Sequence, residues 1–121
     1  MGLNIYFYSS KNGKDLGCGR LGITHNLNTV VDELGKLVGK PYYEVIWRPD
    51  ELLDCKNGEV PVGFVLAYLP QMIKDLIEYE RVLEQHLPKN GWGSIEWLVS
   101  FLCEYLKECY RYKNEYVFCC R

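Results

Sequence analysis

Apolar side chains recur every three or four residues in two long stretches of the chain, residues 27–38 and residues 95–113. This is the period of a helix that buries one face and leaves the other in water. Capping residues precede both stretches, because Thr24 or Asn26 can begin the first helix and Ser94 the second. The pattern predicts an amphipathic helix over each stretch.

The middle of the chain predicts further helical segments. Residues 62–69 are apolar almost throughout and favour a short helix, whereas residues 70–87 keep a helical period that favours a long one. Pro70 stands at their junction, so it either separates two helices or kinks one. Pro49 suits the first position of a brief helical turn. Residues 42–47 are rich in aromatic and β-branched side chains and favour a short strand instead.

Both ends of the chain predict strands. Residues 3–8 and residues 116–120 are β-prone, and the first run ends in turn-forming residues. The glycine-rich stretch between residues 11 and 22 favours a surface loop. We therefore expect an α+β fold that is mainly α: one compact helical domain over residues 1–121, with a small two-stranded sheet formed by the N- and C-terminal strands.

Charge and hydropathy exclude several classes of function. The formal net charge is −2, so the chain lacks the broad basic field of a protein that binds nucleic acid through its phosphates. No apolar run approaches the eighteen or so residues of a membrane span, and the amino terminus does not resemble an export signal. We expect a cytoplasmic protein that has neither nucleic acid nor membrane as its partner.

The cysteines do not predict a metal site or a disulfide framework. They form no CxxC pair and have no His-x-x-His companion. Without an export signal, we expect them to be small buried apolar side chains in a reducing cytoplasm, and we expect no metal and no cofactor. The six cysteines are Cys18, Cys55, Cys103, Cys109, Cys119 and Cys120.

His25 is the first candidate for ligand binding. It follows Thr24 at a predicted helix start, where free backbone amides and the helix dipole favour an anion, and Asn26 stands beside it. In this role the three side chains would hydrogen-bond a phosphate or carboxylate. The structural alternative is local capping by Thr24 or Asn26 next to an ordinary, partly buried histidine.

Trp47 and Arg48 are the second candidate. A tryptophan next to a guanidinium supplies the two groups that stack on bases and grip phosphates, and Arg20 could supply a second cation from the glycine-rich stretch. The structural alternative places Trp47 in the core, with Arg48 paired to Asp50 or Glu51.

Asn90 and Trp92 are the third candidate. Trp92 lies between two glycines just before a predicted helix, so it could line a cavity whose mouth carries Asn90 and backbone amides. The structural alternative is that Trp92 and Trp97 fill the junction between the last two helices.

Three motifs together resemble a family of small, largely uncharacterised proteins encoded by bacteriophages and prophage-bearing bacteria. The resemblance covers most of the chain from residue 23 onward. It implies a bacterial host cytoplasm and a role against host defence, either by blocking a protein or by sequestering a small signalling nucleotide. The motifs are Ile23-Thr24-His25-Asn26-Leu27, Trp47-Arg48-Pro49 and Asn90-Gly91-Trp92-Gly93-Ser94 with Glu96.

The leading hypothesis is therefore a non-enzymatic anti-defence protein that binds a small, anionic, nucleotide-like signal and works as a small homo-oligomer. Such a site needs cationic, aromatic and amide groups in one cavity. A second hypothesis is an inhibitor that presents a tyrosine-rich surface to a host defence protein. A third is a small enzyme that acts through His25 or Cys18. The residues expected to bind the ligand are Arg20, Thr24, His25, Asn26, Trp47, Arg48, Asn90 and Trp92.

Overall fold

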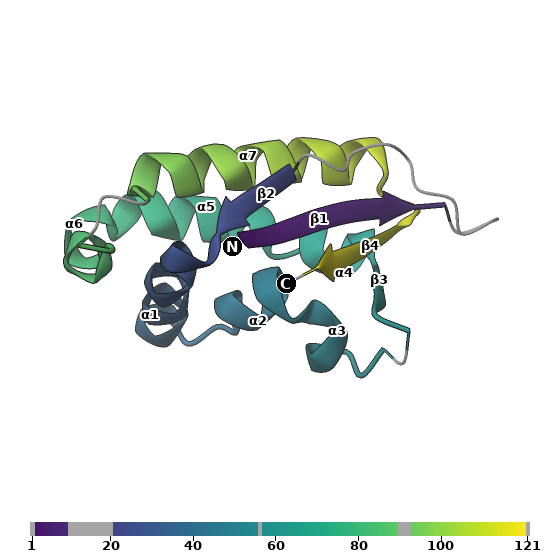
Figure 1. The fold of residues 1–121 in the computed structure, drawn as a ribbon, viewed down its shortest axis with the longest axis horizontal. Coiled ribbons are helices and arrows are strands. Elements are labelled where there is room, and N and C mark those ends of the chain that lie inside the picture. Colours follow the sequence, from purple (N-terminus) through teal and green to yellow (C-terminus); the bar gives the residue numbers. More distant parts are fainter. Residues whose placement is uncertain (1, 10–20, 56, 90–92, 121) are drawn as a thin grey trace.

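The two terminal strands pair at the centre of an antiparallel sheet. The computed structural model describes residues 2–9, 21–55, 57–89 and 93–120. Strands β1 (Gly2–Tyr8) and β4 (Tyr116–Cys120) run antiparallel, with Asn4 opposite Cys120 and Tyr8 opposite Tyr116. This pairing confirms the predicted contact between the ends of the chain, and the fold is α+β and mainly helical, as expected (Figure 1).

The sheet has four strands among the described residues, so the prediction of a two-stranded sheet is wrong. Strand β2 (Leu21–Thr24) pairs with β1, and strand β3 (Glu59–Pro61) pairs with β4, which gives the order β2-β1-β4-β3. Both added strands are edge strands of three or four residues, too short for an alternating pattern to show. The proline of β3 is tolerated because an edge strand needs hydrogen bonds on one side only.

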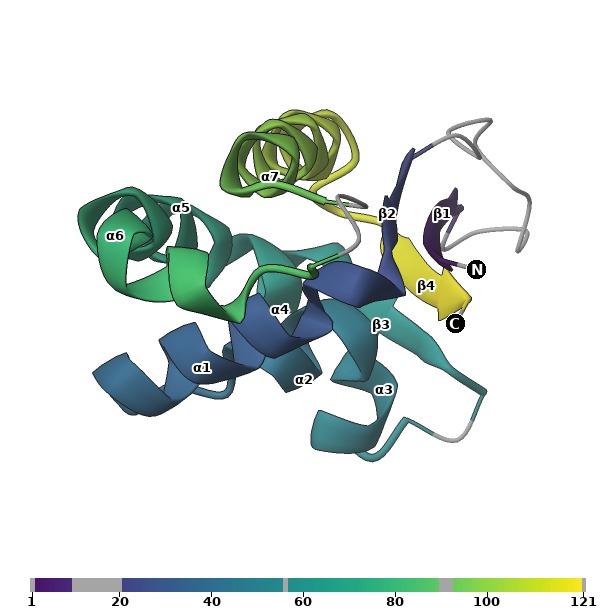
Figure 2. The ribbon, with the colours of Figure 1, turned by 60° about the vertical axis from the view of Figure 1, so that its left-hand side comes forward.

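All described helices lie on one side of the sheet (Figure 2). In β1 the side chains of Leu3, Ile5 and Phe7 are fully buried, whereas the residues between them are exposed or half-buried. Helix α7 (Ile95–Arg111) packs across this buried face, where the rings of Phe7 and Tyr105 meet edge to face at 6.2 Å. The side chain of Ser94 accepts a hydrogen bond from the backbone of Trp97, as expected for a cap.

The other predicted helices form, with shifted boundaries. The first begins with a 3-10 turn, η1 (His25–Leu27), that continues into α1 (Asn28–Val38). The predicted long helix over residues 70–87 is instead a succession of shorter ones: α5, α6 and the 3-10 turn η2. The bounds of the segments in this half of the chain are α4 Val62–Leu66, α5 Leu69–Glu78, α6 Glu80–Leu83 and η2 Glu84–His86.

Helix α2 (Tyr42–Trp47) replaces the predicted strand over residues 42–47, and a helical turn, α3 (Pro49–Leu52), follows it as expected. The strand prediction is wrong because tertiary packing outweighs the weak β-propensity of the segment. The hydroxyl of buried Tyr42 donates to Oδ2 of Asp75 at 2.6 Å, and Gln71 donates to Oδ1 of the same carboxylate at 2.8 Å. The Tyr42 bond anchors α2 to α5, and the Gln71 bond holds the carboxylate from within α5.

The described cysteines divide between core and surface. Cys109 and Cys119 are buried, which confirms the expectation for these two, and Cys55 is half-buried; the expectation is wrong for Cys103 and Cys120, which are exposed. Cys18 lies outside the described residues. None of the described helices combines the length and the apolar character that crossing a membrane requires.

Candidate functional site

Two of the three sequence motifs meet through a hydrogen bond between His25 and Trp47. His25 opens η1 directly after β2, and the preceding Thr24 side chain accepts a hydrogen bond of 3.3 Å from the backbone of Asn26. Trp47 ends α2, is only 2% exposed, and donates from its indole Nε1 to Nδ1 of His25 at 2.8 Å. A buried indole N–H needs a hydrogen-bond acceptor, and His25 provides the acceptor for this core tryptophan.

This bond decides what His25 can do chemically. Because Nδ1 accepts a hydrogen bond, it carries no proton, and in the neutral ring the proton is on Nε2. Neutral His25 can therefore donate a hydrogen bond from Nε2 to a ligand. A general base would need a free lone pair on Nε2 instead. Within the described ranges, no three His, Cys, Asp or Glu side chains lie close enough together to hold a metal ion.

Tyr43 extends this pair into a row of three rings, which we call the aromatic column: Tyr43, Trp47 and His25. The rings of Tyr43 and Trp47 are stacked, with centroids 5.6 Å apart and planes 8° from parallel. The His25 ring lies 6.4 Å from Trp47 at a tilt of 37°. Tyr43 and Trp47 are four residues apart on α2, so the helix itself aligns them.

Arg48 follows Trp47 in sequence, but its charge is engaged by its own neighbours. Its guanidinium Nη1 lies 2.9 Å from Oε1 of Glu51 on α3, and both side chains are largely exposed. Hydrogen bonds to Tyr43, the larger cause, and to Glu51 raise the pKa of Arg48 above its ordinary value. The contact to Glu51 is the structural alternative that the sequence offered for this arginine.

Two hollows open on the surface between α1 and α2, and both are lined by Asp32, Tyr43 and Glu44. The first has a volume of about 390 Å³ and is also lined by Asn28 and Thr29. The second, of about 350 Å³, runs past Lys36 and Lys40 to the loop that joins the two helices. Because they share three residues, we treat the two hollows as one α1–α2 groove.

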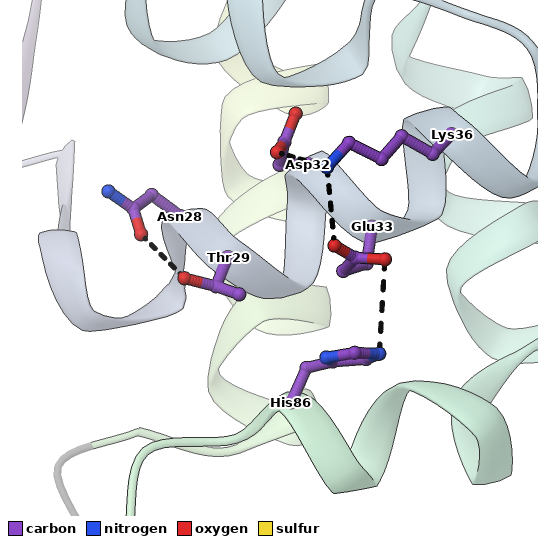
Figure 3. Close-up of polar contacts among 6 residues, drawn as sticks. All are labelled: Asn28, Thr29, Asp32, Glu33, Lys36 and His86. Atoms are coloured by element: carbon purple, nitrogen blue, oxygen red, sulfur yellow. Dashed lines mark hydrogen bonds and ion pairs between the residues drawn. The ribbon is translucent and has the colours of Figure 1, made fainter.

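The carboxylates of Asp32 and Glu44 line both hollows of the α1–α2 groove, whereas Lys36 and Lys40 line only the second. Lys36 lies 3.4 Å from carboxylate oxygens of both Asp32 and Glu33, and Figure 3 shows it reaching back along α1 toward them. These contacts, that to Asp32 most of all, raise the pKa of Lys36 above its ordinary value. In the first hollow, Thr29 donates its hydroxyl proton to the side-chain oxygen of Asn28 at 3.2 Å.

The structure therefore brings some of the predicted site residues together and leaves others apart. Thr24, His25, Asn26 and Trp47 gather around η1, whereas the Arg48 side chain interacts with Glu51. Three further predicted residues, Arg20, Asn90 and Trp92, lie outside the described residues.

The described end of the third motif does approach the first motif. A Cβ atom at Gly93 would lie 2.9 Å from the side chain of Leu27, which fits the glycine at this position. Trp97, expected to fill a helix junction, is 54% exposed instead.

Sequence reasoning missed the residues that line the α1–α2 groove. The sequence favours a short strand over residues 42–47, and a strand would point Tyr43 and Glu44 to opposite sides of a sheet. A helical reading of residues 42–47 would have aligned Tyr43 with Trp47 and revealed the aromatic column.

Comparisons with known proteins leave the family open. No family model matches the chain, and no curated protein or solved structure matches it. The likeness of the three motifs to small phage proteins therefore stays a prediction from the sequence.

Proposed function

We propose that this protein binds a small nucleotide-like molecule in the α1–α2 groove and sequesters it without changing it. The observation that carries the proposal is the lining of the groove around Tyr43: carboxylates line both hollows, and lysines line one of them. A nucleotide can match such a lining, because its base and ribose donate hydrogen bonds whereas its phosphate is an anion.

The charged side chains of the groove match different parts of such a ligand. The carboxylates of Asp32 and Glu44 accept hydrogen bonds from amino and hydroxyl groups, and Asn28 adds a further acceptor. Lys40 provides an ammonium group for a phosphate, whereas the ammonium of Lys36 lies against Asp32 and Glu33. The two hollows, about 390 and 350 Å³, are in the size range of small-molecule sites, roughly 300–1,000 Å³.

The aromatic column supports the site from inside the molecule. Tyr43 lines both hollows, and its stack on Trp47, itself held by His25, limits the orientations that the tyrosine ring can adopt. His25 and Trp47 therefore act as positioning residues in this proposal. Their role differs from the direct ligand contact that the sequence suggested.

The chemistry of the groove favours binding over turnover. Of the residues that the structure describes, no cysteine, serine or histidine lines it, and the nearby His25 is a donor rather than a base while Trp47 bonds its Nδ1. If the resemblance to phage proteins holds, the sequestered molecule is an immune signal of the bacterial host. Sequestration requires tight binding and slow release, and no catalytic group.

Calorimetric titration of the purified protein with a panel of linear and cyclic nucleotides tests this proposal. We expect at least one nucleotide to bind, and Lys40→Ala to weaken its binding about tenfold, or about 1.4 kcal/mol. Lys74→Ala is the matched control, because Lys74 is an exposed lysine on α5 that lines neither hollow. Binding by no nucleotide, or equal loss in both variants, would overturn the proposal.

A further inference from the structure

The outward side of α7 presents a second feature, separate from the α1–α2 groove. A hollow of about 400 Å³ lies between α7 and strand β2, and another of about 250 Å³ lies between α7 and α5. Ser100 lines both hollows, so they flank one turn of α7. We call this surface the α7 face, and Figures 1 and 2 place α7 on a different side of the molecule from α1 and α2.

Large apolar side chains of the α7 face are exposed. Trp97, which lines the hollow beside β2, is 54% exposed, and Ile77, which lines the hollow beside α5, is 56% exposed. Neighbouring positions of α7 such as Leu98 and Leu102 are fully buried, so the exposure is confined to the outward side of the helix. Exposed tryptophan in an apolar surface is typical of protein-binding sites.

Among the described residues that line the two hollows, the charged ones are all glutamates. Glu104 lines the hollow beside β2, and Glu80 and Glu96 line the hollow beside α5. A partner that covers this face must therefore combine apolar side chains with basic ones. Complementary charges at the rim would also speed its association and select against acidic partners.

We propose that the α7 face binds a basic amphipathic helix of a partner protein. A helix laid over α7 can place apolar side chains, spaced three or four residues apart, in the hollows on both sides of the turn around Ser100. Its lysine or arginine side chains then lie next to the three glutamates. This surface is independent of the nucleotide-like ligand.

A second copy of this chain fits the same face poorly. In a symmetric dimer the α7 face would meet itself, so Glu80, Glu96 and Glu104 would face the same set of carboxylates on the second copy. Like charges placed together at an interface disfavour association. The acidic rim thus favours a basic partner over self-association.

The test uses the full-length protein and a labelled synthetic helix with leucines on one face and lysines on the other. Fluorescence anisotropy measures its Kd, with two control peptides: one with the lysines replaced by glutamates, and one of the same composition in scrambled order. Trp97→Ala is compared with Tyr110→Ala, a 59% exposed aromatic of the same helix. Tyr110 lines neither hollow, and it lies about 20 Å further along the helix than position 97.

We expect the leucine–lysine helix to bind and both control peptides to bind much more weakly. Trp97→Ala should raise the Kd about tenfold or more. Glu96→Lys should raise the Kd more than Trp97→Ala does, because it replaces one of the negative charges beside the hollows by a positive one. Tyr110→Ala should leave the Kd unchanged. Because Trp97 and Glu96 are exposed, these variants should keep the thermal midpoint of the wild type, which checks folding.

Three results would overturn the proposal. One is equal binding of the scrambled and amphipathic peptides, and another is an unchanged Kd in Trp97→Ala. The third is a dimer, seen by sedimentation of the protein alone, that Trp97→Ala dissociates, because the α7 face would then be a self-association surface. None of these measurements depends on nucleotide binding.

Discussion

The indole Nε1 of Trp47 donates a 2.8 Å hydrogen bond to Nδ1 of His25, joining residues that are 22 positions apart in the sequence. The bond ties the C-terminal end of α2 to the turn that begins α1. It also fixes the tautomer of the histidine and, through the Tyr43–Trp47 stack, one wall of the α1–α2 groove. Four predictions about the protein alone and its ligand follow from these contacts and their neighbours.

Replacing His25 should destabilise the fold unless the new side chain also accepts the hydrogen bond of Trp47. His25→Ala leaves the buried indole N–H of Trp47 without its acceptor, which we expect to cost about 1–3 kcal/mol. His25→Asn should recover part of this loss, because the asparagine Oδ1 occupies roughly the place of Nδ1. Urea unfolding of the three proteins measures the difference, and equal stability of His25→Ala and wild type would contradict the role given to the bond.

Tyr43 should affect ligand binding mainly through its ring. Tyr43→Ala removes the stack on Trp47, which we expect to cost about 0.5–1.5 kcal/mol of stability, and removes the residue shared by both hollows. Tyr43→Phe keeps the stack and should bind nucleotide with nearly wild-type affinity. Calorimetric titration of both variants tests this, and a loss as large in Tyr43→Phe as in Tyr43→Ala would show that the hydroxyl matters instead.

Gly93 should tolerate a side chain poorly. Its φ is +153°, and an added Cβ would lie 2.9 Å from the Leu27 side chain, so Gly93→Ala should cost on the order of 1–3 kcal/mol. Gly63→Ala is the matched control, because no described atom beyond its chain neighbours and its own helix backbone lies within 4 Å of a Cβ at that position. Thermal unfolding of the pair should show a large loss for the first variant only.

The stability of the protein should fall in alkali because of Tyr42. Burial is the main cause that raises the pKa of the Tyr42 phenol above its ordinary value of 10, and the hydrogen bond to Asp75 adds to it. The unfolded chain therefore ionises Tyr42 at a lower pH than the folded chain does. The stability that this residue contributes is complete below about pH 10 and is lost progressively above it.

Tyr42→Phe provides the check on this pH dependence. The variant should be less stable at neutral pH by about 1–3 kcal/mol, because Asp75 loses a hydrogen bond in the core. Its stability should nevertheless fall less steeply with pH above 10. Burial raises the pKa of Tyr105 as well, so some alkaline loss should remain. Identical slopes in wild type and variant would show that Tyr42 does not cause the loss.

The sequence predicted the parts of the fold that long, regular patterns specify. The helix that buries Leu98 and Leu102, its Ser94 cap, and the pairing of the terminal strands all follow from spacing and local chemistry. Strands β2 and β3 were missed because each has only three or four residues, and pairing partners rather than their own patterns define them.

The candidate site was harder to predict because it depends on packing between α1 and α2. His25 and Trp47 were both recognised as candidates, but only the folded chain shows that one donates to the other. Tyr43 and Glu44 were overlooked because their segment is β-prone, and the burial of Tyr42 and Trp47 outweighs that preference. Local propensity is weakest in such six-residue segments, where the core decides the conformation.

Native mass spectrometry of the protein, incubated with mixed nucleotides and then denatured to release what it holds, tests the central claim most directly. We expect a protein–nucleotide complex that Lys40→Ala weakens and Lys74→Ala does not, and a released ligand of unchanged mass. A released ligand of altered mass, or a complex that forms equally well in Lys40→Ala, would contradict sequestration in the α1–α2 groove.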